Sequence, residues 1–214
     1  ARDHTAEERT TGRAWSEQTQ STYYGQVVVE ALGGPMADGE SSRDAAVQAL
    51  LDKDAIRDVI ARAVRGVDRL DATLLSEAFH PDGVDDHHGF AYCGATIGEE
   101  LTRAQRESML VTSLHITTQT IRVRGDRAGV ESYYLGVHRP SAMDGSTRLL
   151  SSGRMLDELE RRDGEWRISH REVIPDMARL LPIDDEIDLG EQPSRRDRSD
   201  PSYRVVGGWS EVPR

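Results

Sequence analysis

The spacing of apolar residues changes once along this chain, from a helical repeat to an alternating one. Between Leu50 and Val67, apolar residues recur every three or four positions and charged residues fill the opposite face, which predicts an amphipathic helix. From residue 116 onward, apolar residues alternate with polar ones, as in strands that bury one face. A long helix followed by a run of strands predicts an α+β fold in which helices cover one face of a sheet.

Short turn sequences divide the alternating region into strands. Three of them combine Gly or Asp with polar neighbours, at residues 125–127, 143–146 and 162–164. Turns of this composition join neighbouring antiparallel strands. The strands that they separate are predicted at residues 116–124, 128–138, 148–160 and 165–174.

Two shorter helices are predicted at residues 72–79 and 99–110. The first is expected to end at the His-Pro-Asp-Gly sequence of residues 80–83, which is typical of a turn. The second is expected to cross the sheet. Together with the long helix, they predict a curved antiparallel sheet packed on about three helices, a cone-shaped α+β barrel. Such a cone encloses a pocket, so polar residues that face inward become candidates for a site.

The middle of the chain differs in composition from its two ends. Residues 44–178 carry the periodic patterns and are predicted to form one domain, since a single core organises about 100–200 residues. Residues 1–43 lack a sustained period, which predicts a poorly ordered extension. Residues 179–214 are predicted to form a second extension that lies on a partner subunit, with Tyr203 and Trp209 as anchors.

The charge balance limits the possible partners. The formal net charge is −11 and the isoelectric point about 5.1, so attraction to phosphate backbones or anionic lipid surfaces is disfavoured. No apolar run reaches the roughly 20 residues that cross a bilayer, and no secretory signal is recognisable. We therefore expect a cytoplasmic protein that binds neither nucleic acid nor membrane. Cys93 is the only cysteine, so no intramolecular disulfide is possible.

Three polar residues can face the inside of such a cone: Asp68, His115 and Arg171. Asp68 ends the long helix, His115 opens the first long strand, and Arg171 lies in the last strand. If Asp68 accepts a hydrogen bond from His115, the imidazole can act as a general base. Arg171 can then stabilise a negative charge that develops on the substrate. Because alternate residues of a strand point to opposite faces, only one of His170 and Arg171 is expected to line the pocket.

Each of these residues also has an ordinary structural explanation. Asp68 can pair with Arg69 in an exposed turn, and a single histidine in a strand is commonly a structural residue. Arginines on sheets commonly reach water or pair with a nearby carboxylate, here that of Glu172. The catalytic hypothesis therefore depends on all three side chains facing one pocket.

A cluster of Asp85, Asp86, His87 and His88 contains residue types that bind metals. Adjacent residues of an extended chain point in opposite directions, so we expect no metal site and place one histidine, His87, at the rim of the pocket. The sequence lacks the glycine-rich, GxSxG and HExxH motifs of nucleotide, serine-hydrolase and zinc-protease sites. No cofactor is therefore expected.

Four segments resemble the SnoaL-like branch of the nuclear-transport-factor-2-like superfamily. They are Ala-Ile-Arg-Asp (55–58), Gly-Val-Asp-Arg-Leu-Asp (66–71), Phe-His-Pro-Asp-Gly-Val-Asp-Asp-His (79–87) and Glu-Arg-Arg-Asp-Gly-Glu-Trp-Arg-Ile (160–168). The resemblance extends over residues 50–177. It implies a cone with an interior pocket and a homodimer or homotrimer. Relatives in this branch include scytalone dehydratase, bile-acid dehydratase and polyketide cyclases.

The resemblance also implies roles for the candidate residues. In the dehydratases and dehydrochlorinases of this superfamily, an Asp–His dyad removes a proton and an arginine assists. Asp68, His115 and Arg171 fall at the positions of these three residues. Upstream of the dyad aspartate, such enzymes tend to carry a tyrosine or lysine that helps the leaving group, whereas this chain has Ala63. Either another acid, His87 or Tyr134, fills that role, or the reaction lacks a difficult leaving group.

We expect a cofactor-independent lyase or isomerase that acts on a hydrophobic cyclic small molecule, with dehydration as the first choice among reactions. His115 would remove the proton, and Asp68 would orient it. The missing acid would come from one of the residues expected to contact the substrate. These expected substrate-binding residues are His87, Tyr134 and Ala63.

Two other functions are consistent with the sequence. The first is a non-catalytic module that binds a ligand or assembles subunits, which would need no acid at position 63. The second is an epoxide hydrolase that would arrange Asp68, Arg171 and Asp86 around a water molecule. Each of the three functions requires a different set of side chains to meet in the pocket.

Overall fold

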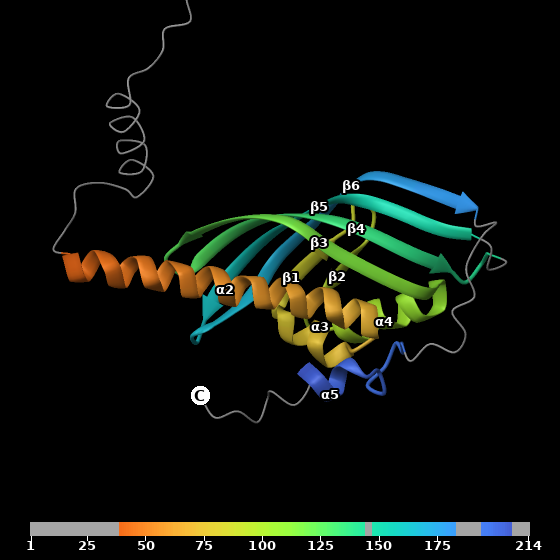
Figure 1. The fold of residues 1–214 in the computed structure, drawn as a ribbon, viewed down its shortest axis with the longest axis horizontal. Coiled ribbons are helices and arrows are strands. Elements are labelled where there is room, and N and C mark those ends of the chain that lie inside the picture. The colour runs from red at the N-terminus through yellow and green to blue at the C-terminus, as the bar shows by residue number, and fades with distance from the viewer. Residues whose placement is uncertain (1–38, 144–146, 183–193, 207–214) are drawn as a thin grey trace, which may run out of the picture. The chain divides into compact units, whose positions relative to one another are not determined.

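The computed structural model describes residues 39–143, 147–182 and 194–206 (Figure 1). Its helices are α2 (Gly39–Arg69), α3 (Ala72–Ala78), α4 (Ile97–Ser108) and α5 (Ser202–Val206). Helices α3 and α4 confirm the two shorter helices predicted from the sequence, whereas α5 was not predicted. None of the helices in these ranges is long and apolar enough to cross a membrane.

Helix α2 begins at Gly39, well before the apolar repeat that starts at Leu50. Residues 42–51 are exposed, and they include alanines and a glutamine, which favour a helix without a buried face. The apolar repeat therefore marks only the part of the helix that packs on the core. The prediction that poor order extends through residue 43 is wrong for the residues from Gly39 onward.

Six strands form one mixed sheet in the order β2-β1-β6-β5-β4-β3. Their bounds are Phe79–Asp86 (β1), Ala91–Cys93 (β2), Met109–Arg124 (β3), Arg127–Pro140 (β4), Thr147–Arg162 (β5) and Glu165–Pro182 (β6). Neighbouring strands are antiparallel, except that β1 runs parallel to β6. The four long strands and the α+β class confirm the prediction. Strands β1 and β2 were not predicted, and the sheet is not purely antiparallel.

Strand β1 contains the four residues predicted to form a turn. Phe79 pairs with Ile168 of β6, and Val84 pairs with His170, so residues 80–83 face a single residue of β6. The turn sequence thus forms a bulge inside a strand instead of ending the element. The residues of β1 that follow the bulge reach the interior and contribute to the site.

Two of the three predicted turns are confirmed by their backbone conformation. Gly125 joins β3 to β4 with a φ of 59°, and Asp163 and Gly164 join β5 to β6 with φ values of 53° and 84°. Positive φ angles favour glycine and tolerate aspartate, which explains the sequence signal. Most of the third predicted turn, 144–146, lies outside the described residues.

The core lies between the helices and one face of the sheet. Helices α3 and α4 and the C-terminal half of α2 lie on the same side of the curved sheet (Figure 1). The most deeply buried apolar side chains come from all these elements: Ile56, Ile60, Ala63, Leu75, Ala78, Phe79, Ile97, Leu159 and Ile168. Beside this core, a cavity remains between the helices and the sheet.

A close approach of α3 and α4 depends on Gly98. A Cβ at this position would collide with Ser76 Oγ and with the carbonyl oxygen of Ala72. We therefore expect Gly98→Ala to lower the free energy of unfolding by about 1–3 kcal/mol. The matched control is Gly89→Ala, because a Cβ there meets nothing within 4 Å. Urea unfolding would measure both, and equal effects of the two substitutions would contradict the packing described.

Candidate functional site

A cavity of about 180 Å³ lies between the sheet and the helices. Seven apolar side chains line it: Val64, Val67, Leu75, Leu101, Leu114, Met155 and Val173. Seven polar side chains also line it: Asp85, His87, Gln105, Tyr134, His138, Ser151 and Arg171. An aliphatic wall that carries a few converging polar groups is typical of sites for small hydrophobic ligands.

Arg171 faces this cavity and is held by a carboxylate on the neighbouring strand. Its Nε and Nη2 donate to the two oxygens of Asp157 at 2.6 and 3.2 Å, and both side chains are buried. Burial raises the pKa of Asp157, against the attraction of Arg171. Burial also opposes the charge on Arg171, but Asp157 holds the pKa of Arg171 above its ordinary value. The guanidinium is therefore a fixed positive charge on the cavity wall.

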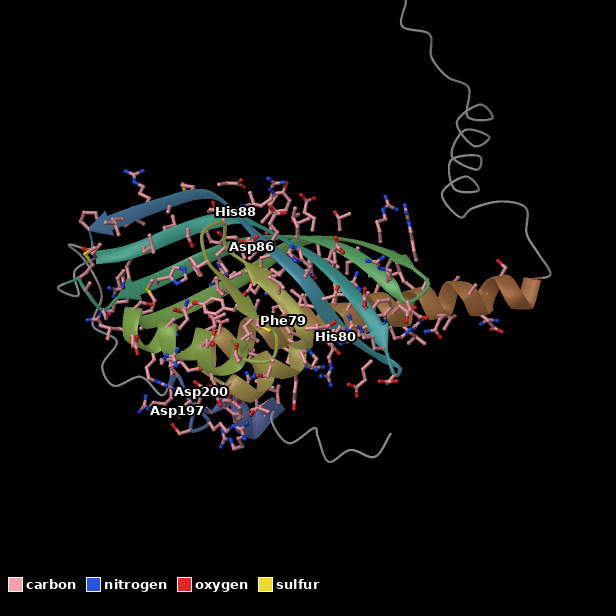
Figure 2. All side chains as sticks on the ribbon, turned by 180° about the vertical axis from the view of Figure 1, so that it is seen from behind. Phe79, His80, Asp86, His88, Asp197 and Asp200 are labelled. Carbon is pink, nitrogen blue, oxygen red and sulfur yellow. The ribbon has the colours of Figure 1, made fainter. Side chains whose placement is uncertain are left out.

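The acidic and imidazole cluster is divided between two faces of the sheet, as alternation requires. Asp85 and His87 line the cavity, and Asp85 Oδ2 lies 3.2 Å from His87 Nε2, although the two atoms are not aligned for a hydrogen bond. Asp86 and His88 lie close together (Figure 2) and are not among the residues that line the cavity. There Asp86 accepts a hydrogen bond from the His88 amide, and His88 Nε2 lies 3.1 Å from Glu172.

His87 and Tyr134, two of the three expected substrate-binding residues, line the cavity. The His87 ring stacks on Phe90, with ring centroids 5.0 Å apart and planes 8° apart. Burial, and then the charge of Asp176, raise the pKa of Tyr134, so its phenol keeps its proton at neutral pH. Ala63 is fully buried in the core and does not line the cavity, so its assignment is wrong. Its face of α2 packs on the core instead.

A third imidazole, that of His138, belongs to a chain of hydrogen bonds across the wall. His138 Nε2 lies 3.2 Å from Ser151 Oγ, and Nδ1 lies 3.5 Å from Thr112 Oγ1. Thr112 in turn donates to Gln105 Oε1 at 3.1 Å. Burial, with a contribution from Arg196, lowers the pKa of His138. This imidazole is therefore neutral at neutral pH and can accept a proton.

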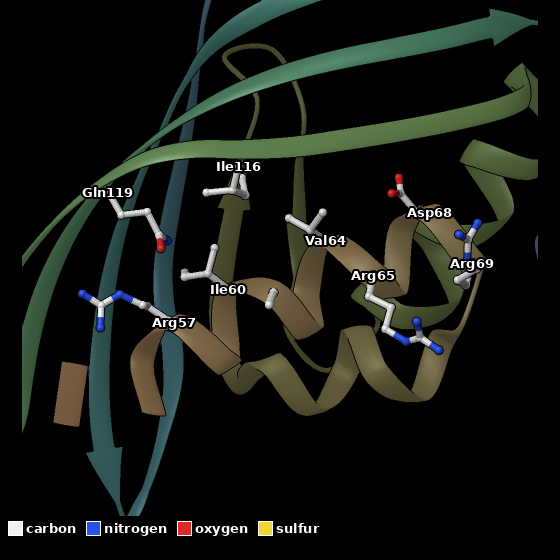
Figure 3. A pocket seen from close by; sticks show the side chains of 9 residues that line it. Arg57, Ile60, Val64, Arg65, Asp68, Arg69, Ile116 and Gln119 are labelled. Carbon is white, nitrogen blue, oxygen red and sulfur yellow. The ribbon is translucent and has the colours of Figure 1, made fainter. Parts of the chain in front are cut away.

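Asp68, near the C-terminal end of α2, is half-buried against strand β3 and is not among the residues that line this cavity. Both carboxylate oxygens accept from the Leu114 amide at 3.2 Å, and the carboxylate points toward β3 (Figure 3). It borders a second hollow of about 320 Å³ along α2. Burial raises the pKa of Asp68 to about 6, against the lowering effects of the Leu114 amide, Arg69, Arg196 and His115.

His115 is exposed, and its Nε2 lies 3.1 Å from Ser113 Oγ on the same strand. Leu114 lines the cavity and Ile116 packs against the core, so alternation along β3 turns His115 the other way. The structure therefore does not bring His115 together with Arg171, and it does not join His115 to Asp68 by a hydrogen bond. The expected inward orientation of His115 is corrected on this ground.

Residues 194–206 fold back onto helices of the same chain. Tyr203 Oη donates to Asp71 Oδ2 at 2.7 Å, and Arg198 contacts the same carboxylate. That carboxylate also caps α3, since it accepts from the amides of residues 73 and 74 at 3.1 and 3.3 Å. Arg196 donates to the carbonyl oxygen of Met109 at 2.5 Å. Tyr203 thus anchors to its own chain, and Trp209 lies outside the described residues.

Four polar residues near the cavity were not singled out from the sequence as site residues: Gln105, His138, Ser151 and Asp157. A signal for two of them was present. His138 shares the inward phase of its strand with Tyr134, and Asp157 shares the buried phase with Met155 and Leu159. A polar residue in the buried phase of a strand indicates a paired or functional group.

The comparison with protein families agrees with the fold. Residues 48–172 match the SnoaL-like domain, which is more than half of the chain. The protein therefore belongs to the SnoaL-like domain family, and its curved sheet with a few helices is that of the nuclear-transport-factor-2-like fold. No curated protein matches the sequence.

Several solved structures share this fold. A hexachlorocyclohexane dehydrochlorinase, LinA type 2, superposes with a TM-score of 0.62 at 20% identity, over 68% of this chain and 99% of that one. The LinA type 3 enzyme of Novosphingobium barchaimii gives 0.57 at 17% identity, over 68% and 99%. A protein with a cystatin-like fold from Novosphingobium aromaticivorans gives 0.52 at 22%, over 71% and 94%. At these identities the similarity shows the fold alone.

Proposed function

We propose that the protein is a cofactor-independent lyase that dehydrates a hydrophobic cyclic small molecule. One observation carries the proposal: a neutral imidazole, that of His138, and a fixed guanidinium, that of Arg171, line the same largely aliphatic cavity. The dehydrochlorinase activity named for two structures of the same fold is an elimination as well. In this proposal His138, on strand β4, takes the role expected of His115, and Arg171, on strand β6, keeps its expected role.

His138 is the proposed general base. Its lowered pKa keeps the ring unprotonated at neutral pH, and its contacts with Ser151 and Thr112 fix the ring orientation. Thr112 gives its only hydroxyl proton to Gln105 Oε1, so it can only accept from Nδ1, and Nδ1 carries the ring proton. Nε2, which lies 3.2 Å from Ser151 Oγ, is therefore the nitrogen that accepts a proton from a C–H bond of the substrate.

Tyr134 and Arg171 complete the proposed elimination. As His138 takes the proton, the C–H electrons form a carbon–carbon double bond, and the hydroxyl group on the neighbouring carbon leaves. The phenol of Tyr134, which burial keeps protonated, gives its proton to that hydroxyl, so that water departs. Arg171 stabilises negative charge on an adjacent carbonyl oxygen. Proton exchange with water returns both residues to their starting states.

Proton removal can be tested without the natural substrate. The two-ring ketone 2-tetralone has acidic α-protons, and proton NMR in D₂O follows their exchange for deuterium. We expect the protein to accelerate this exchange and His138→Gln to slow the catalysed rate by about 10²- to 10⁴-fold. His115→Gln should keep the wild-type rate, since this imidazole is exposed on β3. Loss of exchange in His115→Gln with retention in His138→Gln would overturn the assignment.

Epoxide hydrolysis is a second candidate function, with residues other than those expected. Asp68 and Asp86 do not line the cavity with Arg171, so the expected trio is not assembled. Instead, the charges of Asp157 and Asp85 both act on Arg171. A carboxylate on either side of a guanidinium is the arrangement that such a reaction would use. Formation of a diol from styrene oxide, without exchange of 2-tetralone, would favour this function over dehydration.

A further inference from the structure

Asp85 carries a buried oxygen that no group in the described part of the chain satisfies. The residue is 3% exposed, and its Oδ1 has no hydrogen-bond partner among the described residues. The other oxygen, Oδ2, faces His87. Leaving a buried acceptor without a donor costs about 1–3 kcal/mol, and more for a charged group. A fold keeps such an atom where something else supplies the donor.

The cation next to Asp85 is Arg171, which is hydrogen-bonded to another carboxylate, that of Asp157. Asp85 and Arg171 are paired across β1 and β6, but Nε and Nη2 of Arg171 are bound to Asp157. Two carboxylates therefore share one guanidinium in the buried wall. Asp85 gains long-range attraction from that charge, but no hydrogen bond to Oδ1. Asp85 lines the cavity, so a molecule bound there is a source of the missing donor.

We infer that Asp85 is a ligand-anchoring residue that accepts a hydrogen bond from a hydroxyl group of the bound molecule. The inference rests on the proposed function, because it names the substrate class of the same cavity: a hydroxylated cyclic compound. Oδ1 lacks a donor, and a hydroxyl group can donate to it, whereas an ether or a ketone has no hydrogen to donate. The side chains of Val67, Leu101 and Met155 also line the cavity, so the rest of the ligand is expected to be apolar.

Matched two-ring probes test the anchor. We expect 2-naphthol to bind the full chain at least tenfold more tightly than both naphthalene, which is smaller, and 2-methoxynaphthalene, which is larger. Only 2-naphthol donates a hydrogen bond, and the other two control for size. Ligand fluorescence at pH 7 measures all three. A preference below twofold would mean that water alone satisfies Oδ1 and would overturn the inference.

Variants locate the preference at one carboxylate. Asp85→Ala should reduce the preference for 2-naphthol to within twofold, and Asp85→Asn, which keeps the side-chain shape, should reduce it at least threefold. Asp86→Asn is the matched control on the same strand, because Asp86 bonds to the His88 amide, and it should keep the full preference. If both Asp85 variants fold and keep the tenfold preference, the inference fails.

The outcome is separable from that of the proposed function. The exchange of 2-tetralone depends on His138 and involves a ketone, which has no hydroxyl group to donate. Loss of the naphthol preference with retained exchange would therefore remove the anchor and leave the lyase in place. Retained preference without any exchange would keep the anchor and turn the cavity into a binding site for a hydroxylated ligand.

Discussion

Arg171→Leu should lower the free energy of unfolding by about 3–5 kcal/mol, the range for removing one partner of a buried ion pair. The reason is Asp157, which is 2% exposed and would lose two hydrogen bonds and the cation that makes them. Urea unfolding at pH 7.5, followed by circular dichroism, measures the change. Asp85 lies nearby and adds to the uncompensated negative charge.

A double substitution separates the ion pair from simple packing. Arg171→Met combined with Asp157→Leu removes both charges and keeps most of the volume, and such replacements are often close to neutral. We expect the double variant to recover at least half of the stability lost in Arg171→Leu. Loss of less than about 1 kcal/mol in the single variant would contradict a buried, fully engaged pair. If the single variant does not fold, the double variant still reports whether the charges were the cause.

The sequence predicts the long helix and the long strands of this fold because the spacing of their apolar residues matches the period of a helix or of a strand. The apolar stripe of α2 and the alternation of β4 and β5 reflect burial of one face, and Gly125 and Gly164 mark turns that need a positive φ. The turn predicted at residues 80–83 is instead a bulge within β1, because a His-Pro-Asp-Gly sequence suits either structure. Only pairing with β6, distant in sequence, decides between the two.

The site is predicted less well, because one residue of register decides which side chains enter the cavity. Arg171 lines the cavity and the neighbouring His170 does not, as the alternation along β6 allows. His115 was placed inward, but Leu114 and Ile116 occupy that phase in β3. A local pattern of alternating small and polar residues does not fix this phase. Arg171 has two neighbouring carboxylates, those of Asp157 and Asp85. Both lie on other strands, so no spacing of residues along β6 predicts them.

The pH dependence of stability should reveal the burial of Asp68. Its pKa is raised to about 6 in the folded protein, whereas the unfolded value is near 3.8. A raised carboxyl pKa means that the folded state binds the proton more tightly than the unfolded state. Ionisation of Asp68 therefore destabilises the fold, and stability falls as the pH rises from about 4 to about 6. The full penalty, roughly 3 kcal/mol, is present above that window.

Asp68→Asn removes this penalty while keeping an oxygen that can accept from the Leu114 amide. The stability of the variant relative to wild type should therefore increase by about 2 kcal/mol between pH 4.5 and 7.5. Urea unfolding at several pH values measures the difference. Asp54→Asn is the matched control, since it removes one negative charge from the exposed face of α2 and so reports the effect of the charge change alone. A difference for Asp68→Asn that stays constant or decreases as the pH rises would show that this carboxylate is solvated, and that the gap between α2 and β3 is open to water.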